Sequence, residues 1–100
     1  MSPARKEAQR TLANLRSFVR RGQLTGWVRD RSARPQYELA AIAVCVLEDV
    51  EGVDAAGPFA DRLRGLRDEA MAAGLLTPGQ VLKADASAPA AADRRLAARA

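Results

Sequence analysis

Apolar residues recur at helical spacing in the first part of this chain. Between residues 8 and 19, leucine, phenylalanine, valine and alanine return every three or four positions. At 100° per residue these positions form a stripe about 120° wide, which is typical of an amphipathic helix. Ser2, which precedes a proline, is a helix-start signal, and Gly22 is a helix-stop signal. The pattern therefore predicts a helix over about residues 3–21, followed by a connector.

Two further segments repeat this pattern after the connector, which spans residues 22–34. One covers about residues 35–51, and the other covers about 58–73, beginning at a proline and ending before a glycine. The stretch 42–46 also alternates as a strand would, but a single strand has nothing to pair with here. We therefore expect two more helices, separated by a loop over 52–57.

The end of the chain gives weaker signals. Thr77-Pro78-Gly79-Gln80 has the form of a capping box and predicts a short helix over about 78–83. Residues 84–100 are rich in Ala and Arg, and Leu96 is their one large apolar residue. Such a segment buries little surface, so we expect a disordered tail. The fold expected is all-α, a small three- to four-helix bundle forming a single domain over residues 1–83.

Charge is distributed unevenly along these elements. The net charge is +4, yet residues 1–35 carry nine cationic and two anionic side chains, whereas residues 36–82 carry three and eight. This asymmetry indicates an electrostatic partner, either outside the molecule or within it. Arginine strongly outnumbers lysine and alanine is abundant, which is typical of a GC-rich bacterial genome. Some of the arginines are then expected to lie on an ordinary solvent-exposed surface and not in a binding site.

The cations of the first third are the strongest candidate site. Nucleic-acid binding needs several cations along one surface, so that several phosphates are neutralised together. Arginine suits this role because its planar fork donates two parallel hydrogen bonds to a phosphate. The candidate residues are Arg5, Lys6, Arg10, Arg16, Arg20, Arg21, Arg29, Arg31 and Arg34. They predict a small non-enzymatic regulatory or accessory protein that binds the backbone of DNA or RNA.

The same basic face also fits an acidic protein. In this alternative the chain is an adaptor or inhibitor, comparable to an antitoxin or an assembly chaperone, and Trp27 and Phe59 supply apolar anchors. Trp27 could instead stack on a base or belong to the core. Short amphipathic helices also bury apolar faces between copies of one chain, so a homodimer is a further possibility.

Two other binding modes receive less support from the sequence. A helix-turn-helix would use residues 39–51 and 58–73, but the connection between them is longer than the usual turn. The second of these helices also carries three acidic residues, which a recognition helix usually avoids. The basic first helix could lie on an anionic membrane, but its modest apolar face is better used in the core. No membrane partner is therefore expected.

The residue inventory argues against an enzyme. The chain has no histidine and one cysteine, Cys45, so it offers no Ser-His-Asp triad, no His-ligated zinc and no internal disulfide. Glycine-rich phosphate loops are absent. The acidic residues between 48 and 54 lack the spacing of a calcium loop. We therefore name no catalytic, cofactor-binding or metal-binding residue. No signal peptide is recognisable, so we expect a cytoplasmic protein.

Overall fold

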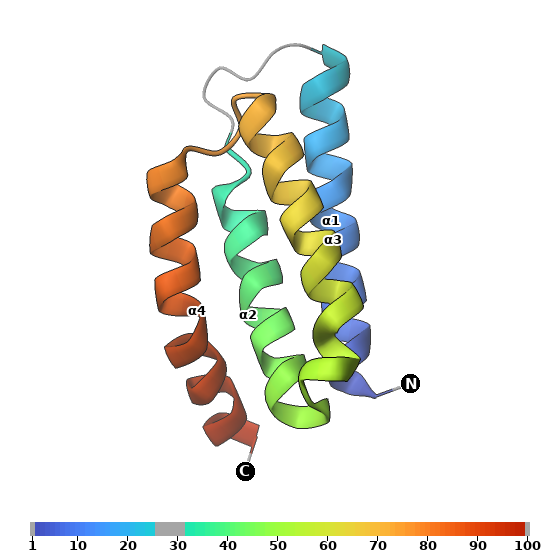
Figure 1. Ribbon diagram of the computed structural model, residues 1–100, viewed down its shortest axis with the longest axis vertical. Coiled ribbons are helices and arrows are strands. Elements are labelled where there is room, and N and C mark those ends of the chain that lie inside the picture. The colour runs from blue at the N-terminus through green and yellow to red at the C-terminus, as the bar shows by residue number, and fades with distance from the viewer. Residues whose placement is uncertain (1, 26–31, 100) are drawn as a thin grey trace.

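The chain folds into four helices connected by short segments (Figure 1). The computed structural model describes residues 2–25 and 32–99, and the side chains of residues 25 and 99 are left aside. The helices are α1 (Pro3–Thr25), α2 (Arg34–Glu51), α3 (Val53–Ala72) and α4 (Pro78–Arg99). They run alternately up and down, and the described residues contain no strand. The prediction of an all-α bundle with three to four helices is confirmed.

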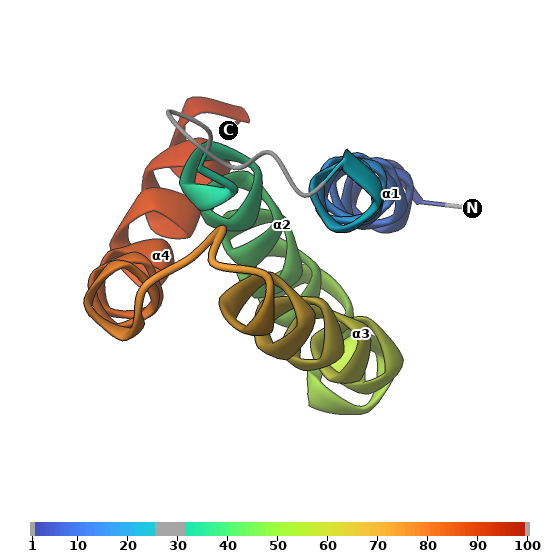
Figure 2. The ribbon, with the colours of Figure 1, turned by 90° about the horizontal axis from the view of Figure 1, so that it is seen from above.

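Helix α2 is the centre of this arrangement. Helices α1 and α3 pack against it and against each other, whereas α4 packs on the opposite side of α2 (Figure 2). Helix α4 therefore does not close the bundle between α1 and α3. One groove between those two helices stays open on the side away from α2.

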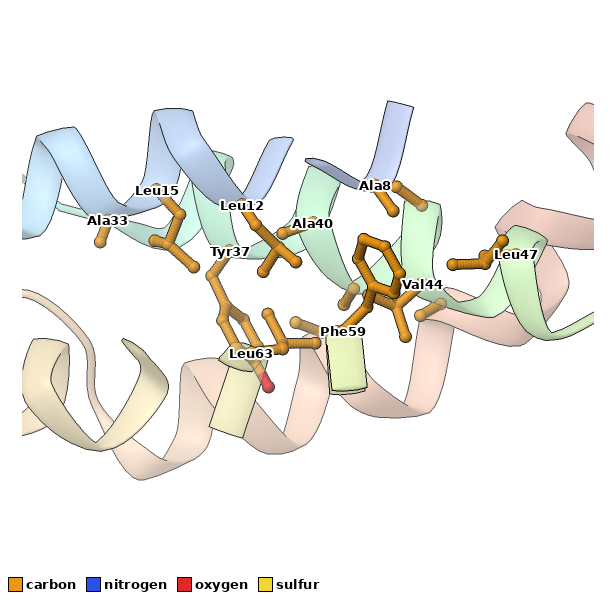
Figure 3. Packing of buried hydrophobic residues seen from close by; sticks show 14 of the residues in the cluster. Ala8, Leu12, Leu15, Ala33, Tyr37, Ala40, Val44, Leu47, Phe59 and Leu63 are labelled. Carbon is orange, nitrogen blue, oxygen red and sulfur yellow. The ribbon is translucent and has the colours of Figure 1, made fainter. Parts of the chain in front are cut away.

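The main core lies between α1, α2 and α3 (Figure 3). Its large buried side chains are Leu12, Leu15 and Val19 of α1, Tyr37, Val44 and Leu47 of α2, and Phe59 and Leu63 of α3. Burying one such side chain contributes about 1.5–3 kcal/mol, so this three-helix contact is the main source of stability. It also fixes α1 and α3 side by side, which positions the open groove.

Helix α4 packs through small side chains. Val81, Ala84, Ala88 and Ala92 are buried at spacings of three and four, and the helix packs mainly on α2. The prediction of a helix ending at residue 83 and a disordered tail over 84–100 is therefore wrong, because the helix continues to Arg99. Alanine has the highest helix propensity, and a stripe of alanines lets two helices approach closely. The expectation of disorder was based only on the number of large apolar residues and left the alanines out.

Two helix starts follow the sequence signals closely. The backbone N–H of Arg5 donates to the hydroxyl of Ser2 at 3.1 Å, as expected for a cap of α1. At the start of α4, the N–H of Thr77 donates to the side-chain oxygen of Gln80 at 3.0 Å. The N–H of Gln80 donates back to the Thr77 hydroxyl at 3.1 Å. Both local predictions are confirmed.

The end of α1 differs from the prediction. The helix does not stop at Gly22 but continues to Thr25. Gly22 is buried, and a Cβ built on it would lie 2.8 Å from a methyl carbon of Leu75, which is itself 2% exposed. A glycine stands here because the segment before α4 packs directly on the α1 backbone. The rest of the predicted connector includes 26–31, which lies outside the described residues.

The junction between α2 and α3 is also shorter than predicted. Helix α3 begins at Val53, so the expected loop over 52–57 is reduced to Gly52. Gly52 has φ +101°, a conformation that residues with a side chain rarely adopt. Pro58 lies inside the helix rather than at its start, at the cost of one backbone hydrogen bond. The two helices form an antiparallel hairpin (Figure 1) rather than a helix-turn-helix.

Candidate nucleic-acid interface

Seven of the nine predicted cations lie in the described part of the chain. Arg29 and Arg31 are outside it, as is Trp27, so these predictions remain predictions. The seven do not form one uniform surface. They divide into residues paired with carboxylates of the same chain and residues that line grooves or face outward.

Three of the predicted arginines form ion pairs within the fold. The pairs are Arg5 with Glu51, Arg10 with Glu7, and Arg34 with Glu38. The Arg5 guanidinium lies 3.1 Å from the Glu51 carboxylate, and the Ser2 hydroxyl also donates to that carboxylate. These contacts join the start of α1 to the end of α2. Arg5 therefore has a structural role that the sequence pattern did not reveal.

Lys6, Arg16 and Arg20 are exposed and have no ion-pair partner among the described carboxylates. At 100° per residue, Arg16 and Arg20 lie within about 40° of each other on the edge of α1 that faces α3. Lys6 follows on the outer face of the same helix. Arg21 lies on the opposite edge and lines a smaller groove between α1 and α2.

The open groove between α1 and α3 brings the exposed arginines together with a residue that was not predicted. This α1–α3 groove has a volume of about 670 Å³ and includes Arg16 and Arg20 from α1 and Arg62 from α3. Leu12 and Leu66 give it an apolar floor. Three arginines from two packed helices thus line one space, and the core beneath them fixes how the two helices lie against each other.

Arg62 is held in place by an aromatic ring. Its guanidinium carbon lies over the ring of Phe59, 5.1 Å from the ring centre. Phe59 is only 6% exposed, so the ring is a fixed support for the cation. Helical spacing alone places Arg62, Leu66 and Glu69 on one edge of α3. The packing of that edge beside α1 depends on the tertiary fold, which explains why Arg62 was missed.

The groups with perturbed pKa values do not suggest catalysis. Burial raises the pKa of the Cys45 thiol, and the charge of Glu48 raises it further, so the reactive thiolate is disfavoured. Burial also raises the pKa of Tyr37, and its hydrogen bond to Asp85 adds to the rise. The Tyr37 hydroxyl donates to Asp85 at 2.7 Å and joins α2 to α4. Both groups have structural explanations.

The remaining searches add no further site. Within residues 2–25 and 32–99, no three side chains of the metal-ligating types gather closely enough to hold an ion. None of the helices in those ranges has an apolar stretch long enough to cross a membrane. In comparisons with known proteins, no family model, no curated protein and no solved structure matches this chain.

Proposed function

We propose that this protein binds the phosphate backbone of a nucleic acid and acts as a non-enzymatic regulatory or accessory protein. The observation that supports this most is the grouping of Arg16, Arg20 and Arg62 along the α1–α3 groove. None of the three has an ion-pair partner among the described carboxylates. These three cations outnumber the one carboxylate of the groove, Glu69, so the surface favours an anionic partner.

The chemistry of these side chains favours phosphate. An arginine fork donates two parallel hydrogen bonds to a phosphate, and each neutralised phosphate releases counterions. The two cations on α1 are one helical turn apart, and Arg62 approaches from the other wall. Lys6 lies on the outer face of α1 and extends the basic surface beyond the groove. A chain of phosphates can therefore meet several cations at once.

The alternative, an adaptor that docks an acidic protein, has less support. Phe59 is buried under Arg62 and cannot serve as an apolar anchor. The exposed valines Val50 and Val53 lie at the α2–α3 turn, where the neighbouring charges are acidic. Leu24, Leu39 and Leu82 are also exposed, but they lie on three different helices, and scattered exposed leucines are common on protein surfaces.

Fluorescence anisotropy with labelled duplex DNA and single-stranded RNA tests the proposal. The variant Arg16→Glu/Arg20→Glu reverses two groove charges, and we expect it to lose binding at near-physiological salt. The control Lys83→Glu/Arg94→Glu makes the same charge change on exposed positions of α4, away from the groove. Equal losses in both variants, or retained binding in the first, would contradict the proposal. Circular dichroism confirms that both variants are folded.

A further inference from the structure

We propose that the α1–α3 groove is a subsite for one unstacked base of a single-stranded nucleic acid. This inference rests on the proposed function and adds the kind of strand and the part of the nucleotide that enters. Arg16 and Arg20 bind the flanking phosphates, and the base lies on the apolar floor against Arg62. The groove volume of about 670 Å³ is in the range of small-ligand pockets, about 300–1,000 Å³.

The apolar floor is the first argument for a base. Leu66 is partly buried and presents aliphatic carbon between the charged walls, and Leu12, which is 3% exposed, closes the floor beneath it. Phosphate oxygens, which a duplex presents on its outside, are bound by hydrogen-bond donors rather than by aliphatic carbon. The face of an unstacked base is apolar and fits it. Proteins that bind single strands combine a positively charged groove with surfaces for base stacking.

Gly65 supplies the second argument. It lies in the interior of α3 and lines the groove, where glycine costs about 1 kcal/mol relative to alanine. A Cβ built on Gly65 would have no heavy atom of a neighbouring segment within 4 Å. Internal packing therefore does not require this glycine. The space that it leaves open lets a flat ligand approach the helix backbone closely.

The position of Arg62 supplies the third argument. Phe59 holds its guanidinium 5.1 Å from the ring centre, at the wall of the groove. Guanidinium planes are stacking surfaces for unstacked bases in single-stranded recognition. Because the ring beneath it is buried, this surface exists before the ligand arrives.

Glu69 explains how the groove distinguishes the base from the backbone. Its carboxylate faces the same groove and has no ion-pair partner among the described cations. A carboxylate repels phosphate but accepts a hydrogen bond from an exocyclic amino group, as acidic residues do with cytosine. We therefore expect a base with an amino group, such as cytosine or adenine, to be preferred over uracil.

Groove-filling variants separate this inference from simple charge attraction. Gly65→Leu adds a side chain to the groove without changing any charge, and Ala13→Leu fills it from the α1 wall. The matched control is Gly79→Leu on α4, where a Cβ also meets open space. The probes are oligo-C RNA, oligo-U RNA and a duplex, each about 12 nucleotides long, in the range of single-strand site sizes.

We expect the wild-type protein to bind oligo-C more tightly than oligo-U or the duplex. Gly65→Leu and Ala13→Leu should each weaken oligo-C binding about tenfold and leave duplex binding unchanged, because stacking of a base contributes roughly that factor. The control Gly79→Leu should change neither oligo-C binding nor duplex binding. Glu69→Gln should reduce the preference for oligo-C over oligo-U.

Two patterns overturn the inference. Equal binding of single strand and duplex, with no effect of the filling variants, refutes the base subsite. If Arg16→Glu/Arg20→Glu still abolishes binding in that case, the proposed function survives. If the wild-type protein binds no oligonucleotide, both proposals fail, and an acidic protein becomes the partner to seek.

Discussion

The first half of α1 holds its arginines in ion pairs within the fold, whereas the second half turns them toward a groove. Arg5 and Arg10 each lie against a carboxylate of the same chain. Arg16 and Arg20 form no ion pair with a described carboxylate and share a groove with Arg62 and Glu69. Both halves contain similar numbers of cations. The two halves therefore differ in the surroundings of each cation rather than in the number of charges, and on that ground the second half is the one proposed to bind a ligand.

The antiparallel arrangement of α1 and α2 accounts for this difference. The start of α1 and the α2–α3 turn lie at the same end of the molecule (Figure 1). The acidic residues around this turn, including Glu51, are therefore close to the first half of α1. At the other end, the second half of α1 packs beside the upper part of α3, and Glu69 is the one acidic side chain of the groove.

Replacing one pair of arginines in each half of α1 by alanine should give the largest difference in nucleic-acid affinity. Arg16→Ala/Arg20→Ala should weaken nucleic-acid binding roughly tenfold or more, because hydrogen bonds between charged groups are the strongest available contacts. Arg5→Ala/Arg10→Ala removes the same charge but should weaken binding about twofold or less, since those side chains are already paired. Titrations by anisotropy at one fixed salt concentration measure both. Comparable losses would remove the distinction between the two halves.

The close contact between Gly22 and Leu75 should make an added side chain in the second half of α1 destabilising. Gly22→Ala gains helix propensity, but its Cβ would lie 2.8 Å from a buried methyl group. Overpacking costs about 1–3 kcal/mol and exceeds the propensity gain of roughly 1 kcal/mol, so the variant should be less stable. Urea denaturation followed by circular dichroism gives the free energy of unfolding. A more stable variant would show that Leu75 adjusts without cost.

The Ser2 cap should matter for stability and not for binding. Ser2→Ala removes the cap of α1 and the hydrogen bond to Glu51. Loss of such a cap costs about 1 kcal/mol. The same urea titration measures this loss, while oligonucleotide affinity should stay at the wild-type value. A clear loss of affinity would assign the first half of α1 to the binding surface.

Gly65→Ala should have the smallest effect and the opposite sign. No neighbouring segment lies within 4 Å of a Cβ at this position, so the alanine meets no clash. Higher helix propensity should stabilise the protein by up to about 1 kcal/mol. Thermal unfolding of Gly65→Ala and Gly22→Ala, measured side by side, compares the effects of the two substitutions on stability. Destabilisation by both would mean that the groove wall is packed more tightly than its geometry indicates.

The sequence predicted those parts of the fold that depend on neighbouring residues. The Ser2 cap and the Thr77–Gln80 capping box are local, and both form as expected. The start of α3 and the length of α4 depend on packing. Pro58 is tolerated inside a helix that already begins at Val53, and the alanine stripe of residues 84–92 is ordered by its contact with α2.

The candidate site shows the same limit. Helical spacing placed Arg16 and Arg20 on one side of α1, and in the structure both line one groove, whereas Arg21 lines another. Helical spacing could not reveal that Arg5 pairs with Glu51, 46 positions away, or that Arg62 approaches from α3. Each of these facts depends on which helices pack together, and the apolar patterns of the separate helices do not specify that.

The most direct test is the salt dependence of binding to a single-stranded oligonucleotide. The logarithm of the binding constant falls linearly with the logarithm of salt concentration, with a slope of about 0.7 per neutralised phosphate on single strands. The account predicts that Arg16→Ala/Arg20→Ala lowers this slope by about 1.4, whereas Lys83→Ala/Arg94→Ala leaves it unchanged. Parallel lines for the wild-type protein and the groove variant would contradict the claim that the second half of α1 binds the backbone.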